Sequence, residues 1–345
     1  MKSSLCEDKE DILRISSLVV LIVGGLLNII VFLGIVRVPL RGLCRFFFLT
    51  EPLSWCVYQV FFLLSLGTFC FVLQLVLCDL ISLLCYPLKE WLLAGFCGVV
   101  NGLEILAGTA TMYIIIAVNF HAVSTHNLAV CQHLRELKRR HDHAEQTTVH
   151  VPTDCNNDES AGNEVKVRRT LTIDYQLNRM KRRIQTILPS ISIWIFATSM
   201  ALPHVLYTES PINSCCSLSL HISHLETLPF VAMIVFQLAI PILCFICGIF
   251  LLGVKLITFQ LDLKMCKLAE DVKEILVFAL ILTLSFVLIT LLGYSLKFLA
   301  GLEVPTSTYA KFLNITHSFM PTIRPFIYLT TLKHLRKSIM MFFIQ

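Results

Sequence analysis

Several ionisable and polar side chains lie within long apolar runs of this sequence, and they are its clearest candidates for chemistry. Asp79, Glu104, His204 and His317 are the members of this set. A charged group at the centre of a bilayer costs about 2.5–3.5 kcal/mol or more, so such residues normally face the interior of a helix bundle and mark binding or ion sites. We therefore treat them as candidate site residues.

Glu104 would suit a ligand with a positive group, because exclusion of water strengthens the attraction between opposite charges. The alternatives are a hydrogen bond to a neighbouring polar group or a protonated carboxyl in the core. His204 and His317 could line the same cavity, or could satisfy an interface and a helix contact.

Motifs of catalysis are missing from the sequence. It has no glycine-rich phosphate loop, no nucleophile elbow and no carboxylates paired at catalytic spacing, so we expect neither an enzyme nor a cofactor. Cys244-x-x-Cys247 lies in an apolar run, where two lipid-buried thiols are expected rather than a metal site. The basic segments lack interleaved aromatic residues, which argues against binding of nucleic acid.

The composition points to a membrane protein. Of the 345 residues, 56% are hydrophobic and only 15% are charged, against about 45–50% and about 25% in soluble domains. A spanning helix needs about 20 apolar residues, because lipid cannot satisfy an open backbone. Seven stretches meet this requirement: 13–36, 67–88, 95–122, 184–206, 227–253, 275–299 and 308–330.

Residues 46–66 are nearly as apolar as these stretches, but the distribution of charge argues against an eighth crossing. Cytoplasmic loops are rich in Lys and Arg, and both 37–45 and 123–183 are basic, so an even number of crossings must separate them. We expect 46–66 to lie along the membrane interface or to extend the second helix.

The remaining loops give a consistent topology. Residues 207–226 contain no Lys or Arg, whereas the tail 331–345 is basic. This pattern predicts an outside N-terminus (1–12) with a retained signal anchor, a seven-span domain (13–330) and a cytoplasmic interfacial helix (331–345). The inner loop 123–183 is expected to be partly disordered. Its basic flanks favour contact with anionic lipid, and docking of a partner is the alternative.

Short motifs at defined depths in these helices resemble those of the rhodopsin-like (class A) G-protein-coupled receptors. The first helix carries Gly-Gly-Leu-Leu-Asn28-Ile-Ile-Val, similar to Gly-Asn-x-x-Val, and the second carries Leu-x-x-x-Asp79-Leu with Pro87 further out. Arg324-Pro325-Phe-Ile-Tyr328 and the basic segment after it resemble Asn-Pro-x-x-Tyr and its interfacial helix. Further matches are Trp91, Cys97, Trp194, Pro203 and Pro241.

This sequence also departs from the family pattern at the switch motifs. Asn119-Phe120-His121 stands near the place of Asp-Arg-Tyr without its arginine, and the sixth helix lacks Cys-Trp-x-Pro and hence a proline kink. The residue in place of the retinal-binding lysine is Ser318, so an opsin is not expected.

The resemblance implies specific roles for several residues. It implies a disulfide from Cys97 to Cys215 or Cys216, a ligand site near Glu104, and a switch role for Pro325 and Tyr328 together with Asn119, Phe120 and His121. It also implies a sodium site at Asp79 near Asn28. Because Arg324 replaces the family's asparagine beside this carboxylate, we expect a bidentate buried ion pair with Asp79, in which the guanidinium replaces sodium.

Taken together, the sequence predicts an all-helical, seven-span receptor of the plasma membrane. The resemblance implies that it binds an extracellular ligand between its helices and signals to a heterotrimeric G protein, and Glu104 favours a ligand with a positive group. One alternative is a receptor-like membrane partner that does not couple to a G protein. The other is a transporter or channel, which the scarcity of intramembrane charges and the lack of internal repeats disfavour.

Overall fold

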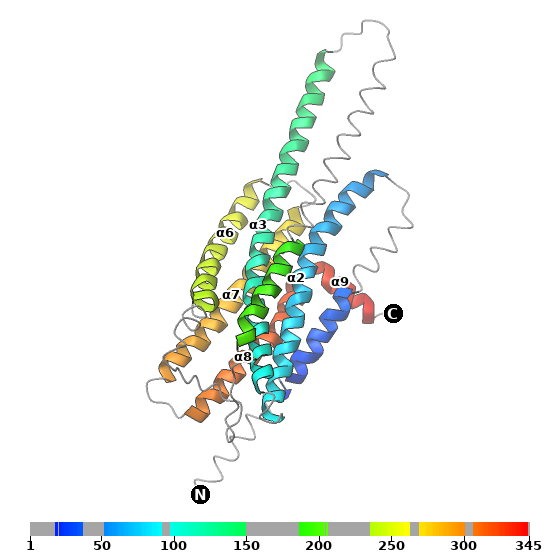
Figure 1. Cartoon of the computed structure of the whole chain (residues 1–345). Helices are drawn as coiled ribbons and strands as arrows, with labels where there is room; N and C mark the ends of the chain where they lie inside the picture. Colours follow the sequence, from blue (N-terminus) through cyan, green and yellow to red (C-terminus); the bar gives the residue numbers. More distant parts are fainter. Residues whose placement is uncertain are drawn as a thin grey trace.

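The computed structural model shows an all-helical chain in every part that it describes, with no strand among those residues. Helices lie side by side in one bundle (Figure 1). The described residues are 18–19, 21–36, 52–91, 97–149, 186–203, 205, 235–262, 269–300 and 306–343, with side chains for most of them.

Each apolar stretch predicted from the sequence overlaps a helix. A short helix spans Leu21–Val36 and another spans Thr186–Pro203. The others are α2 (Pro52–Trp91), α3 (Cys97–Val149), α6 (Ile240–Asp262) after the π-helical turn η2 (Val235–Ala239), α7 (Ala269–Ala300), α8 (Thr306–Thr331) and α9 (Lys333–Phe343).

Five of these helices are long and apolar enough to cross a membrane: Gly67–Cys85, Gly98–Cys131, Thr186–Pro203, Ile240–Phe259 and Glu270–Ile289. Side chains on their outer faces, such as Phe250 (70% exposed) and Ile257 (71%), are large and apolar. Apolar surface of this extent suits lipid rather than water. The chain is therefore a membrane protein by length and composition of its helices.

One alternative is decided and one boundary differs from the sequence prediction. Residues 52–66 are the first turns of the 40-residue α2, so of the two alternatives for 46–66, an extended second helix is confirmed for this part. The first part of the predicted inner loop, 123–149, is not an open loop, because α3 continues through it for a total of 53 residues. In Figure 1 the end of α3 projects far beyond the other helices.

α3 is the central helix of the bundle, in contact with α2, α6 and α7, while α8 packs between α2 and α7. Helix 186–203 is fastened to α2 through one amide side chain. Gln74 donates to Ser190 Oγ (2.9 Å) and accepts from Trp194 Nε1 (3.1 Å). A polar contact of this kind can hold helices together where lipid supplies no hydrophobic driving force between them.

A proline explains the π-helical turn that precedes α6. Pro241 has no N–H, so the carbonyl of Phe236, five residues earlier in a π-turn, receives no backbone bond from that position. The Tyr113 hydroxyl of α3 donates to this carbonyl at 2.7 Å. The Tyr113 ring also packs edge-on against Phe196, with 5.0 Å between ring centroids. Tyr113 thus joins three segments of the bundle.

We expect Tyr113→Phe to destabilise the protein by about 1 kcal/mol, because it removes the hydroxyl donor and keeps the ring. The measurement is thermal unfolding of the purified chain in detergent. Ser199→Ala is the matched control, since the Ser199 hydroxyl bonds only the Phe196 carbonyl of its own helix. Equal melting temperatures for Tyr113→Phe and this control would contradict the assigned role.

Candidate functional site

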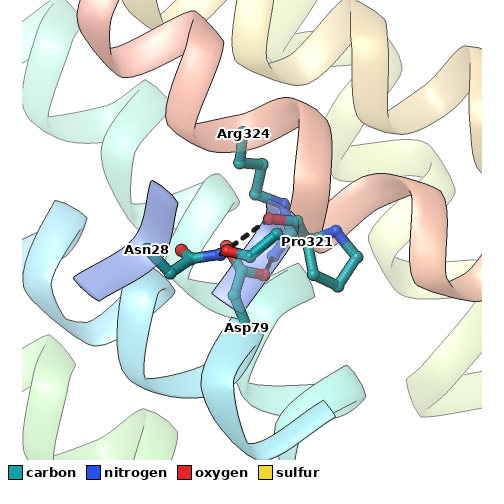
Figure 2. Close-up of polar contacts among 5 residues, drawn as sticks. Asn28, Asp79, Pro321 and Arg324 are labelled. Atoms are coloured by element: carbon teal, nitrogen blue, oxygen red, sulfur yellow. Dashed lines mark hydrogen bonds and ion pairs between the residues drawn. The ribbon is translucent and has the colours of Figure 1, made fainter. Parts of the chain in front are cut away.

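Four polar side chains meet in the buried centre of the bundle, from three helices far apart in sequence. Asn28 of helix 21–36, Asp79 of α2, and Arg324 and Tyr328 of α8 are all at most 4% exposed. Figure 2 shows three of them converging beside Pro321. Positions that the resemblance placed in one site are therefore neighbours in space.

The expected ion pair between Asp79 and Arg324 is present, with Arg324 Nη1 donating to Asp79 Oδ1. It has one nitrogen–oxygen contact rather than the predicted two. Asp79 Oδ2 and Arg324 Nε have no hydrogen-bond partner among the described residues. The guanidinium instead lies over the Phe286 ring of α7, 5.9 Å from its centroid, where the face of the ring favours a cation.

The Asn28 side chain bonds backbone carbonyl groups rather than Asp79 or Arg324. Its amide nitrogen donates to the carbonyl oxygens of Gly24 and Pro321, both at 2.8 Å. The Pro321 carbonyl would normally accept from the N–H four residues later, and that residue is Pro325, which has none. Asn28 therefore supplies the hydrogen bond that Pro325 removes and fixes helix 21–36 against α8.

Tyr328 is fully buried beside this pair and packs edge-on against Phe278 of α7, with 6.0 Å between ring centroids. Its hydroxyl has no hydrogen-bond partner within the described part of the chain. Pro325 is buried as well. Tyr328 thus lies where α8 meets α7, in a position to respond to movement between these helices.

The other three predicted switch residues diverge from one another. Asn119 is buried, and its side-chain oxygen accepts a hydrogen bond from Thr283 Oγ1 of α7 at 2.8 Å. Phe120 is 63% exposed on the outside of the bundle. His121 faces α2, where its ring packs edge-on against Phe71. The three side chains therefore do not meet in one cluster, because successive helical residues point about 100° apart. Their switch role stays a prediction.

α6 also meets Asn119 closely. A Cβ atom on Gly248 would lie 2.8 Å from Asn119 Nδ2, so only glycine admits the amide at this distance. Asn119 thus joins α3 to α7 by a hydrogen bond and to α6 by close packing. The Asn119–Thr283 contact, the Gln74 bridge and the Phe286 ring beside Arg324 were not predicted. Thr283 and Gln74 as isolated polar residues in apolar runs were the available signal.

The predicted ligand site is covered only in part. Glu104 is half-buried on α3. His204 and the side chain of His317 lie outside the described residues, as do the side chain of Cys97 and both of Cys215 and Cys216. Neither the ligand site nor the disulfide is tested by the structure, and both stay predictions. Cys244 and Cys247 have free thiols, and no group of potential metal ligands occurs in the described ranges.

A scan against models of known protein families finds no match to this chain, and a search of curated proteins finds no significantly similar sequence.

Neutralising either member of the ion pair should destabilise the chain more than neutralising both. Asp79→Asn or Arg324→Asn leaves one buried charge without its partner, at a cost of about 3–5 kcal/mol, and the double change removes both charges. The measurement is the fraction recovered as folded, monodisperse protein from membranes, together with its melting temperature. Strictly additive losses would show that the two charges are not coupled.

Thr283→Val should destabilise the protein by about 1–3 kcal/mol, because it removes the donor to the buried Asn119 oxygen while nearly conserving volume. Ser285→Ala is the matched control: its hydroxyl bonds the Leu282 carbonyl within α7 and reaches no other helix. Thermal unfolding of the two variants is the comparison. A loss for Ser285→Ala as large as that for Thr283→Val would contradict a role in joining α3 to α7.

Proposed function

We propose that the chain is a seven-span receptor of the rhodopsin-like class that binds an extracellular ligand within its bundle and activates a heterotrimeric G protein. In this proposal the five long apolar helices are joined by helix 21–36 and α8 as the first and last spans, with α9 at the inner membrane surface. The N-terminus is outside and the protein resides in the plasma membrane.

The main support for the proposal is that three motifs, far apart in the sequence, lie next to one another in the structure. Asn28, Asp79 and the Arg324-to-Tyr328 segment lie on three helices and meet in one buried cluster. If each fragment resembled the receptor motif only by chance, the three fragments would have no reason to lie together in the bundle. The proline-containing α8, followed at once by α9, adds a further feature that suits the receptor class.

The cluster also supplies a physical basis for switching. The ion pair joins α2 to α8, and Tyr328 packs against α7, so displacement of α8 changes both contacts. A ligand that favours one arrangement shifts the population of receptors toward it, by as much as its affinities for the two arrangements differ. Because Arg324 already balances the charge of Asp79, this switch would need no sodium ion.

A second candidate is a receptor-like membrane partner that does not couple to a G protein. The arrangement at Asn119-Phe120-His121 favours it, since no arginine stands there and Asn119 is held by Thr283. In this alternative the chain keeps the receptor fold and acts by association with another membrane protein.

The test is G-protein activation in cells that express the intact chain, across the major G-protein families, at rest and with a library of amines and neutral ligands. We expect activation above that of cells without the chain in one family at least. For a cationic agonist, Glu104→Gln should reduce potency about 10–100-fold, because it removes one charge-assisted contact.

Surface delivery is measured in parallel with a tag on the N-terminus, accessible without permeabilisation if the proposed topology holds. Ser199→Ala, which removes a hydroxyl bonded to the Phe196 carbonyl within the same helix, is the control. Absence of activation in every family despite normal surface delivery would contradict coupling and favour the membrane-partner function. An activating cation unaffected by Glu104→Gln would contradict only the ligand assignment.

A further inference from the structure

Three polar contacts join the acidic start of α7 to the start of α9. Glu270, Asp271 and Glu274 lie on the first two turns of α7, and Lys333 and His334 are the first two residues of α9. The Glu274 carboxylate accepts a hydrogen bond from the backbone N–H of Lys333 at 2.5 Å. Glu270 pairs with Lys333 Nζ at 3.3 Å, and Asp271 lies 3.5 Å from His334 Nε2.

The bend between α8 and α9 explains why the Lys333 N–H is free to donate to Glu274. Leu332 separates the two helices, yet its N–H still bonds the Tyr328 carbonyl at 3.0 Å. The next N–H, that of Lys333, begins α9 and is among the donors that a helix leaves without an internal partner. A carboxylate at this point satisfies that donor and interacts favourably with the positive end of the helix dipole.

The same turns carry apolar side chains that are buried in the closed arrangement. Val272, Ile275 and Leu276 of α7 are at most 7% exposed, as are Leu332 and Leu335 at the bend and on α9. Leu335 packs beside helix 21–36, since a Cβ atom on Gly34 would lie 3.4 Å from its side chain. The polar contacts thus join the starts of two helices whose apolar side chains are buried in the common core of the bundle.

The contacts are individually weak, which favours reversible separation of the start of α7 from the start of α9. Lys333 and Glu270 are 43% and 78% exposed at their side chains, and exposed pairs of this kind contribute about 0–1 kcal/mol each. The hydrogen bond that Glu274 accepts from the Lys333 N–H is partly buried, unlike the exposed Glu270–Lys333 pair. Deeper in the bundle, α7 is held separately by the Thr283–Asn119 bond. Only the end of α7 is therefore held by the α9 contacts.

We propose that these contacts form a latch, the α7–α9 latch, that holds the start of α7 against the start of α9 and whose release frees the first turns of both helices. The latch acts on the conformation of the chain itself, so it operates whether or not the chain activates a G protein. Glu274 is its main element, and the exposed Glu270–Lys333 pair adds to it.

The test is hydrogen exchange, followed by mass spectrometry, on the full chain in lipid nanodiscs. Glu274→Ala should accelerate exchange about fivefold to tenfold in peptides that cover 269–277 and 333–339, because both ends lose their shared contact. Peptides from the centre of α3 should exchange at the wild-type rate. Lys337→Ala is the matched control, because it removes an exposed cation one helical turn after Lys333. It should leave the exchange rates of both peptides unchanged.

Charge reversal provides a second route that does not require Glu274→Ala to fold. Lys333→Glu places a carboxylate beside Glu270 and Glu274 and should accelerate the same two peptides, while Glu270→Lys added to Lys333→Glu should restore part of the protection. The proposal is overturned by unchanged exchange in both single variants. It is also overturned by acceleration throughout the bundle, by equal acceleration in Lys337→Ala, or by a double variant no slower than Lys333→Glu.

Discussion

The buried charge pair of Asp79 and Arg324 sets the relation between α2 and α8. Each charge would be prohibitively costly alone in the bundle, and the attraction between them offsets the loss of hydration only while the two helices hold the groups together. The ring of Phe286 and the buried Tyr328 surround the guanidinium, so α7 also shapes this environment. Three helices therefore have little freedom to slide past one another without separating opposite charges in a dry interior.

Backbone hydrogen bonding explains how two proline-containing helices are accommodated beside this pair. Pro325 and Pro241 each leave a carbonyl without its helical donor, and in each case a side chain from a neighbouring helix supplies one. Asn28 serves the first and Tyr113 the second. In lipid no water can donate to such a carbonyl. A hydrogen bond lost within one helix is therefore replaced by a hydrogen bond between two helices. The prolines thus contribute to helix pairing as well as to local shape.

Hydropathy and charge were sufficient to predict the helical class and the approximate place of each apolar helix, and they excluded a separate crossing at 46–66 without deciding between the interface and an extended second helix. The Asp79–Arg324 pair was also accessible from sequence, because the resemblance places Arg324 beside the Asp79 carboxylate. Three details could not be predicted, because hydropathy does not report which faces of two helices meet. They are the single nitrogen–oxygen contact of the ion pair, the Pro321 carbonyl as the acceptor for Asn28, and the hydrogen bond from Thr283 to Asn119. The length of α3 was missed since polar residues after Cys131 are equally compatible with a helix and a loop.

The length of α3 has a mechanical consequence. At about 1.5 Å per residue its 53 residues extend about 80 Å, whereas a bilayer with its headgroups is about 40–45 Å thick. One continuous helix is thus nearly twice as long as such a bilayer is thick. Val149 lies 30 residues beyond Asn119, or about 45 Å along α3, so a tilt of about 10° at Asn119 displaces this end of the helix by about 8 Å. Small rearrangements around Asn119 would therefore be magnified at Val149.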